Sequence, residues 1–323
     1  MPEFVDGEMD ALAHNGIFVE DQTVGRMLLS GKDGIDLLHR LSTNDLLHLT
    51  PGVSARTVLT TEKGRIVDLL RVVPKAKDYL ILGSFGREKE VLQWIERFTI
   101  TEDCTLRSLD AETVVLTITG KDAFATLSRF SAKATVQGTV SEESGIVIIS
   151  EVLRGCDWIH LLVPNNDRSR VWQELIRAGF TPARNETLEA ARILNGIATS
   201  PGELSLNFTP YDVGLRDCIS YTKGCYIGQE VIARLETYQK TQRELAGFTS
   251  RSGSVRPGEE LEGENGSIIG VVTSVVADKQ GSIGLAVVRH DAAGGGKRAK
   301  VLGGDAVVDL HILPMQRELL TRH

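Results

Sequence analysis

The sequence predicts an α+β protein built from two similar ferredoxin-like units followed by a smaller unit of antiparallel strands. Three observations support this prediction: an internal repeat, β-branched runs within each repeated part, and a change after Arg243 to short apolar runs separated by glycine or proline. The chain of 323 residues exceeds the length at which a single hydrophobic core usually stops growing. Several structural units are therefore expected.

The repeat begins with two segments that share a Gly-Lys-Asp turn. Residues 29–41 and 118–130 each read as an apolar strand, this turn, and apolar positions at helical spacing. We expect the turn aspartates, Asp33 and Asp122, to cap the helices that follow. The alternative is chance similarity, because Gly-Lys-Asp is a common capping turn.

Each turn is followed by further elements in the same order. A strand and a helix are predicted within 78–98 and again within 157–176. The β-branched residues of 65–73 and 145–149 suit additional strands. The repeated units thus cover about 20–100 and 110–185, and each is consistent with a ferredoxin-like layer of strands and helices. A further helix is expected from Glu186 to about Arg192.

The C-terminal part reads differently. Short apolar runs separated by glycine or proline indicate a small antiparallel barrel or sandwich; they lie at 245–248, 268–276, 283–288 and 307–313. Gly294 to Gly296 is interpreted as a hairpin tip. We therefore divide the chain into a first region, 1–242, and a C-terminal region, 243–323.

Composition excludes several classes of protein. A net charge of −7 argues against a surface built to bind nucleic acid. The first thirty residues contain no apolar segment typical of a secretory signal or membrane span, so a cytoplasmic location without membrane attachment is expected. Four cysteines and seven histidines show no metal-ligand spacing, which predicts reduced thiols and no metal site.

One stretch has the composition of a reactive site. Glycines flank Cys225, so the backbone is free to turn sharply there and leave the thiol uncovered. Lys223 and Arg234 supply positive charge, which favours the thiolate form. The alternative is a buried cysteine that acts as a small apolar residue.

The segment Lys-Gly-Cys-Tyr-x-Gly-Gln-Glu at 223–230 resembles the signature of the YgfZ-type folate-binding proteins. Those proteins are similar in fold to the glycine cleavage T protein, an aminomethyltransferase, and are associated with the maintenance of iron–sulfur enzymes. The resemblance implies a ring of two ferredoxin-like units followed by a β-barrel. It also implies that tetrahydrofolate or a derivative sits in a central channel.

Carried over by position, the resemblance implies a set of site residues. It gives catalytic roles to Cys225 and Asp68 and folate contacts to Asp68, Asn44, Lys223, Tyr226, Gln229 and Arg234. Simpler interpretations are an exposed strand position for Asp68 and a first helical turn for Gln229. Arg234 could equally form a surface ion pair with Glu230, four residues earlier.

Two positions depart from the aminomethyltransferase pattern. Val67 stands where those enzymes have the first of two adjacent aspartates, and Leu194 stands where they have a glutamate that reads the pterin. The leading hypothesis is therefore a folate-binding protein that acts with iron–sulfur enzymes or their assembly factors. The alternatives are an aminomethyltransferase that passes a one-carbon unit to tetrahydrofolate, and a scaffold that has kept the fold without the chemistry.

Overall fold

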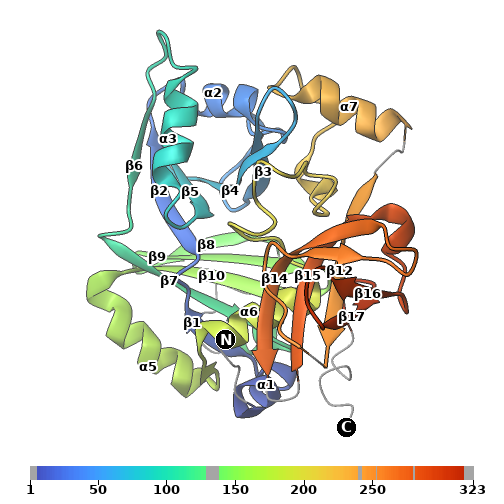
Figure 1. The fold of residues 1–323 in the computed structure, drawn as a ribbon. Coiled ribbons are helices and arrows are strands. Elements are labelled where there is room, and N and C mark those ends of the chain that lie inside the picture. Colours follow the sequence, from blue (N-terminus) through green and yellow to red (C-terminus); the bar gives the residue numbers. More distant parts are fainter. Residues whose placement is uncertain (1–5, 129–137, 239–241, 252, 279–280, 316–323) are drawn as a thin grey trace.

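A computed structural model describes residues 6–128, 138–238, 242–251, 253–278 and 281–315. Its first sheet has five antiparallel strands in the order β3-β4-β5-β2-β6. Their bounds are β2 (Val24–Ser30), β3 (Ala55–Thr60), β4 (Ile66–Pro74), β5 (Tyr79–Ser84) and β6 (Thr105–Ser108). Two helices, α2 (Gly34–Leu41) and α3 (Glu88–Glu96), cover one face of this sheet through a core that includes Met27, Leu37 and Leu70 (Figure 1).

The second sheet has six strands in the order β11-β1-β7-β10-β9-β8. Their bounds are β1 (Ile17–Glu20), β7 (Thr113–Thr119), β8 (Val140–Glu143), β9 (Ile146–Leu153), β10 (Cys156–Pro164) and β11 (Thr181–Pro182). The helices α4 (Ala123–Leu127) and α5 (Arg168–Ala178) pack on it through Phe18, Leu161 and Leu175. A short 3₁₀ turn, Asn165–Asp167, precedes α5.

Both predicted repeat segments fold as a strand, a turn and a helix, but the predicted caps are wrong. The side chain of Asp33 makes no capping bond to α2 and accepts a hydrogen bond from the Asp103 N–H at 2.9 Å instead. Asp122 has a left-handed backbone (φ +59°) and also makes no cap. Asp157, from the neighbouring strand β10, accepts from the Phe124 N–H at 2.9 Å and replaces that cap. Residues 129 and 130 lie outside the described part of the chain.

The C-terminal region is a closed barrel, not a sandwich, in the order β12-β15-β14-β13-β16-β17. Its strands are β12 (Arg243–Ser250), β13 (Glu260–Glu262), β14 (Ile268–Asp278), β15 (Gly281–Arg289), β16 (Arg298–Val301) and β17 (Val307–His311). The prediction of an α+β fold with a C-terminal barrel is confirmed. Gly294 to Gly296 do form a turn, but not a hairpin tip, because the flanking strands β15 and β16 are not neighbours in the barrel.

Helix α6 (Asn185–Asn195) joins the second sheet to the barrel. One part of its surface packs with α1 (Asp6–Ala13) through Leu12 and Leu188, and another packs on the barrel through Ile193 and Leu285. Of the described helices, α5 and α6 reach 11 residues each. Within the described residues, no helix is long and apolar enough to cross a membrane.

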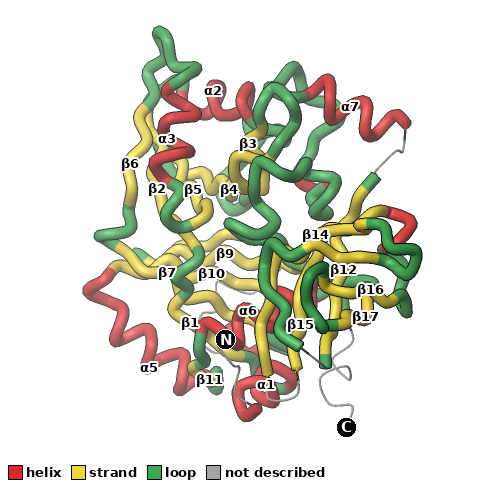
Figure 2. Tube along the Cα trace, viewed as in Figure 1, coloured by secondary structure: helices red, strands yellow, loops and turns green. Residues whose placement is uncertain are grey.

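A long connecting segment, residues 196–228, leads from α6 to α7 (Gln229–Tyr238) and contains the 3₁₀ turn Arg216–Cys218. Figure 2 shows it as loop between the first sheet and the barrel. Its apolar side chains, among them Leu204 and Phe208, form one cluster with Ile66 of β4 and Val287 of β15. The segment is therefore a packed junction between the first sheet and the barrel.

Candidate functional site

A cavity of about 140 Å³ lies between the two sheets and α6. Its wall combines Arg56 and Arg71 from the first sheet, Glu151 and His160 from the second, and Arg192 from α6. Two adjoining hollows, of about 500 and 330 Å³, share residues with this wall. Together the three spaces reach the size range of small-molecule sites.

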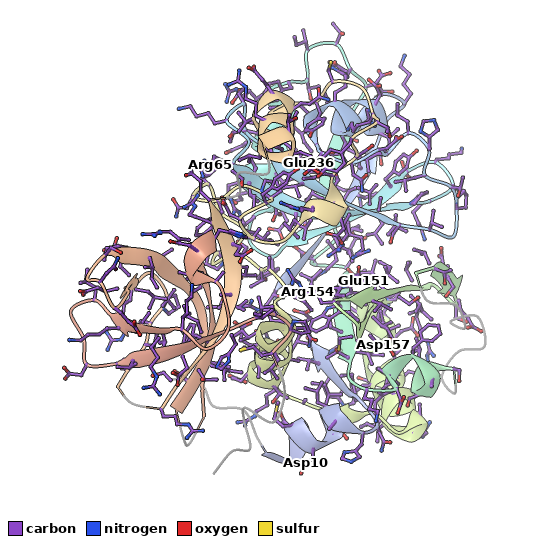
Figure 3. All side chains as sticks on the ribbon, turned by 90° about the vertical axis from the view of Figure 1, so that its right-hand side faces the viewer. Asp10, Arg65, Glu151, Arg154, Asp157 and Glu236 are labelled. Atoms are coloured by element: carbon purple, nitrogen blue, oxygen red, sulfur yellow. The ribbon has the colours of Figure 1, made fainter. Side chains whose placement is uncertain are left out.

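A charged pair crosses the cavity from sheet to sheet. The guanidinium of Arg71 forms an ion pair with Glu151, and Arg56 approaches the same carboxylate at 3.8 Å. Arg71 also donates to the Ser54 hydroxyl at 3.1 Å. Figure 3 labels Glu151 and Arg154 near the centre of the molecule, where these strands face one another (Figure 3). The pair links the two sheets and places two guanidinium groups in the wall.

A row of hydrogen bonds runs across three neighbouring strands of the second sheet. The Thr117 hydroxyl on β7 contacts an oxygen of Asp21 at 2.7 Å and Nδ1 of His160 at 2.9 Å. Asp21 directly follows β1 and also accepts from the Thr23 N–H at 2.8 Å. Burial lowers the pKa of His160, so the imidazole is held in its neutral form.

Helix α6 contributes a buried arginine to the same wall. Arg192 pairs with Glu189 one turn earlier and with the fully buried Glu203 at 3.2 Å. It also donates to the Ser274 hydroxyl of β14 at 2.6 Å. Arg192 therefore connects α6, the segment 196–228 and the barrel at the point where the cavity opens into the 500 Å³ hollow.

The 330 Å³ hollow has a basic wall. Arg154 and Arg216 line it together with Arg56 and the acidic Asp217. Burial lowers the pKa of Arg154. Its guanidinium lies against Gly214, where an added Cβ would stand 2.2 Å from a guanidinium nitrogen. Three arginines beside one aspartate make this hollow the part of the site best suited to an anionic group.

Asp68 is fully buried rather than exposed on its strand. Leu69 and Arg71 line the cavity, and strand alternation directs Asp68 to the other face, beside Met27 and Leu70. The Ser84 hydroxyl, which belongs to the cavity wall, donates to Asp68 at 2.6 Å. Burial raises the pKa of Asp68. The carboxyl group therefore does not line the cavity itself but contacts Ser84, which does.

Cys225 is an exposed free thiol. It lies in a loop, residues 220–228, that we call the Cys225 loop. Gly228 in this loop has φ +84°, and an added Cβ there would meet the Thr61 carbonyl oxygen at 2.6 Å. The neighbouring Gly224 has open space around it. The thiol is uncovered, as the flanking glycines predict, but Cys225 is not part of the central cavity wall.

Lys223 holds the Cys225 loop to the end of α2. The Lys223 ammonium donates to the carbonyl oxygens of Ser42 and Asn44, each at 2.8 Å, and to that of His39. The Asn44 side chain is itself bonded to the Arg56 carbonyl at 2.8 Å. The side chains of Lys223 and Asn44 are therefore both occupied by bonds to backbone carbonyl groups.

Tyr226, Gln229 and Arg234 also lie outside the central cavity wall. Tyr226 is buried, with its ring 5.1 Å from the Lys223 ammonium. Gln229 is the first residue of α7. Arg234 forms an exposed ion pair with Glu230 at 2.6 Å. This is the surface ion pair that was the alternative to a folate contact. The structure thus gathers Cys225, Lys223 and Tyr226 in one loop and leaves Asp68 elsewhere.

Sequence reasoning missed the residues that form the cavity wall. Arg71, Glu151 and His160 each interrupt an otherwise apolar strand: Arg71 in Leu-Leu-Arg-Val-Val and His160 in Trp-Ile-His-Leu-Leu. A polar residue on a buried strand needs a partner. That signal was available in the sequence, although the partner's identity was not.

Comparison with known proteins shows which families and folds this chain is similar to. Residues 1–143 match the GCVT N-terminal domain. The chain is 25% identical to a chloroplastic protein of Arabidopsis thaliana named as a transferase, over 92% of this chain and 70% of the relative. It is also 25% identical to an aminomethyltransferase of Thermosipho melanesiensis, over 84% of this chain and 76% of the relative.

The fold agrees with these matches. The glycine cleavage system aminomethyltransferase T of Bartonella henselae superposes with a TM-score of 0.80 at 19% identity, over 97% of this chain and 91% of that one. The first part of the chain and the curated relatives are thus similar to GCVT-like proteins, and the solved structure shows the same fold.

Proposed function

We propose that this protein binds a reduced folate in the central cavity and takes part in one-carbon transfer of the aminomethyltransferase type. The observation that carries the proposal is the two-part wall. In the inner part, neutral hydrogen-bonding groups such as His160 and Ser84 lie beside arginines that are already paired with glutamates. The outer hollow is lined by Arg154 and Arg216. The similarity to proteins named aminomethyltransferase supports the same reaction class.

A folate suits such a wall because its two ends differ chemically. The pterin is a neutral, planar group that is recognised by directional hydrogen bonds. The glutamate tail carries carboxylates that pair with guanidinium groups. We place the pterin beside His160 and Ser84, and the tail beside Arg154 and Arg216. When bound, reduced folate supplies the nitrogen atoms that accept the one-carbon unit.

In this proposal Asp68 is a positioning residue. Its two carboxyl oxygens accept from the N–H and hydroxyl of Ser84, at 3.0 and 2.6 Å. These bonds fix the orientation of Ser84 in the wall. Replacing Asp68 by asparagine therefore perturbs the ligand through Ser84.

The test is an anaerobic titration of the purified protein with tetrahydrofolate in monoglutamyl and triglutamyl forms. We expect saturable binding, weakened about tenfold by Asp68→Asn for both forms. Arg154→Ala should weaken the triglutamyl form more than the monoglutamyl form, because longer tails bring more carboxylates to the arginines. The control is Arg107→Ala, an exposed arginine on β6 paired with Glu112, which should leave both affinities unchanged. Absence of binding would refute the proposal and favour a scaffold.

Aminomethyl transfer has a separate readout. We expect ammonia release when the protein receives an aminomethyl-loaded lipoyl carrier and tetrahydrofolate, with a known aminomethyltransferase as positive control. No ammonia, under conditions where the control releases it, would restrict the proposal to folate binding.

A second candidate function is supported by the position of Cys225. Its thiol is exposed on a loop that a buried lysine holds against α2, outside the central cavity wall. A surface thiol of this kind suits contact with another macromolecule. We propose that this thiol serves iron–sulfur enzymes in the way the YgfZ-type resemblance implies. A Cys225→Ser variant that fully restores iron–sulfur enzyme activity in a deletion strain would refute this role.

A further inference from the structure

The bonds of Thr117 determine which nitrogen of His160 carries hydrogen. A threonine hydroxyl has one hydrogen to donate. Asp21 accepts hydrogen bonds from the Thr23 N–H and hydroxyl, and its second oxygen takes the Thr117 hydroxyl hydrogen at 2.7 Å. The contact between Thr117 and Nδ1 of His160 at 2.9 Å then requires Nδ1 to be the donor.

This arrangement leaves Nε2 of His160 as an acceptor. A neutral imidazole with hydrogen on Nδ1 has a free lone pair on Nε2. His160 belongs to the cavity wall and is 9% exposed. Among the described residues, Nε2 has no hydrogen-bond partner. The cavity therefore contains an oriented acceptor that the protein does not use internally.

Nearby acidic groups are already engaged. Glu151 is paired with Arg71 and approached by Arg56, and Glu189 is paired with Arg192. Leu194 packs in the interface between α6 and the barrel and carries no acceptor. Neither the paired glutamates nor Leu194 offers a free acceptor to a ligand in the cavity.

We infer that Nε2 of His160 accepts a hydrogen bond from an N–H group of the pterin, with Thr117 and Asp21 holding the ring in the required tautomer. This inference rests on the proposed function. It assigns the reading of the pterin to the second sheet and gives Thr117 and Asp21 the role of positioning residues.

Two pairs of variants test the inference by tetrahydrofolate titration. His160→Asn retains a donor to Thr117 but has no acceptor at the place of Nε2, and we expect about tenfold weaker binding. His160→Gln places its amide oxygen near that position and should bind within about threefold of wild type. Thr117→Val removes the hydroxyl and should weaken binding about fivefold, whereas Thr117→Ser should retain affinity.

The outcomes separate the inference from the proposed function. If the wild-type protein does not bind tetrahydrofolate, the proposed function and this inference both fail. If wild type binds and His160→Asn binds equally well, the inference alone is overturned. Equal weakening by His160→Asn and His160→Gln would also overturn it, provided that far-ultraviolet circular dichroism shows both variants folded. Should the His160 variants not fold, unchanged binding by a folded Thr117→Val variant overturns it, and selective weakening supports it.

Discussion

Replacing Lys223 by methionine should destabilise the protein by about 2–4 kcal/mol. Methionine has a similar length but no donor, so the carbonyl groups of His39, Ser42 and Asn44 lose their ammonium partner. Each buried carbonyl left without a donor costs about 1–3 kcal/mol. Removing a buried charge returns part of the desolvation cost, which brings the net loss below the sum for three carbonyls.

The effect of Lys223→Met should also depend on pH. Burial lowers the pKa of Lys223 to about 8 from its ordinary 10.5. Between these two values the unfolded chain binds more protons at this site than the folded chain does, so the wild-type protein gains stability as pH rises. The variant lacks that gain. The difference in unfolding free energy should therefore widen from pH 8 towards pH 10.5.

Urea unfolding followed by circular dichroism measures the loss, and hydrogen exchange of residues 39–44 and 220–228 shows where it occurs. The control is Lys63→Met, an exposed lysine in the turn between β3 and β4, for which a change within about 0.5 kcal/mol is expected. If Lys223→Met is as stable as this control and exchange in both segments is unchanged, the three carbonyl bonds do not stabilise the loop.

Three further changes test other parts of the structure. Glu151→Gln should cost about 3–5 kcal/mol in urea unfolding, because it leaves the buried Arg71 without its carboxylate, whereas Arg56 keeps Asp217; a loss below 1 kcal/mol would contradict this. Gly228→Ala should cost about 2 kcal/mol or more, since its φ is +84° and an added Cβ meets backbone. Gly224→Ala should be neutral, and equal melting curves for the two variants would show the argument to be wrong. Burial raises the pKa of Cys218 to about 12, which keeps it a thiol at pH 8. Iodoacetamide should therefore alkylate the exposed Cys225 first and Cys218 only after unfolding. Mass spectrometry of the alkylated peptides measures this order.

The sequence predicted the fold well where patterns are long. Strands β4 and β14 are nine and eleven residues long and are rich in β-branched residues, and the repeated turns mark where helices begin. The three-residue β13 and four-residue β16 were missed, because alternation over so few positions carries little information. The caps at Asp33 and Asp122 were predicted wrongly because the bond from the Asp103 N–H to Asp33 and the bond from the Phe124 N–H to Asp157 depend on tertiary contacts.

The site was predicted only in part for the same physical reason. Local glycines are enough to predict an exposed Cys225. By contrast, Lys223 looked like a charge placed for the thiol, and only the folded chain brings three carbonyl groups to its ammonium. The cavity wall depends on two sheets facing each other, so the pairing of Arg71 with Glu151, eighty positions along the chain, has no local signal.

The cluster that joins segment 196–228 to Ile66 and Val287 has a consequence for the order of folding. Its members come from parts of the chain more than two hundred positions apart, so closing it carries a large loop-entropy cost until both flanking layers exist. We expect the junction to consolidate last during refolding and to open first under mild denaturant. Because the 500 Å³ hollow is lined by Val271 and Ser274 of the barrel as well as by Phe208 of this segment, a protein synthesised only as far as α7 would have its sheets in place but would lack one wall of that hollow.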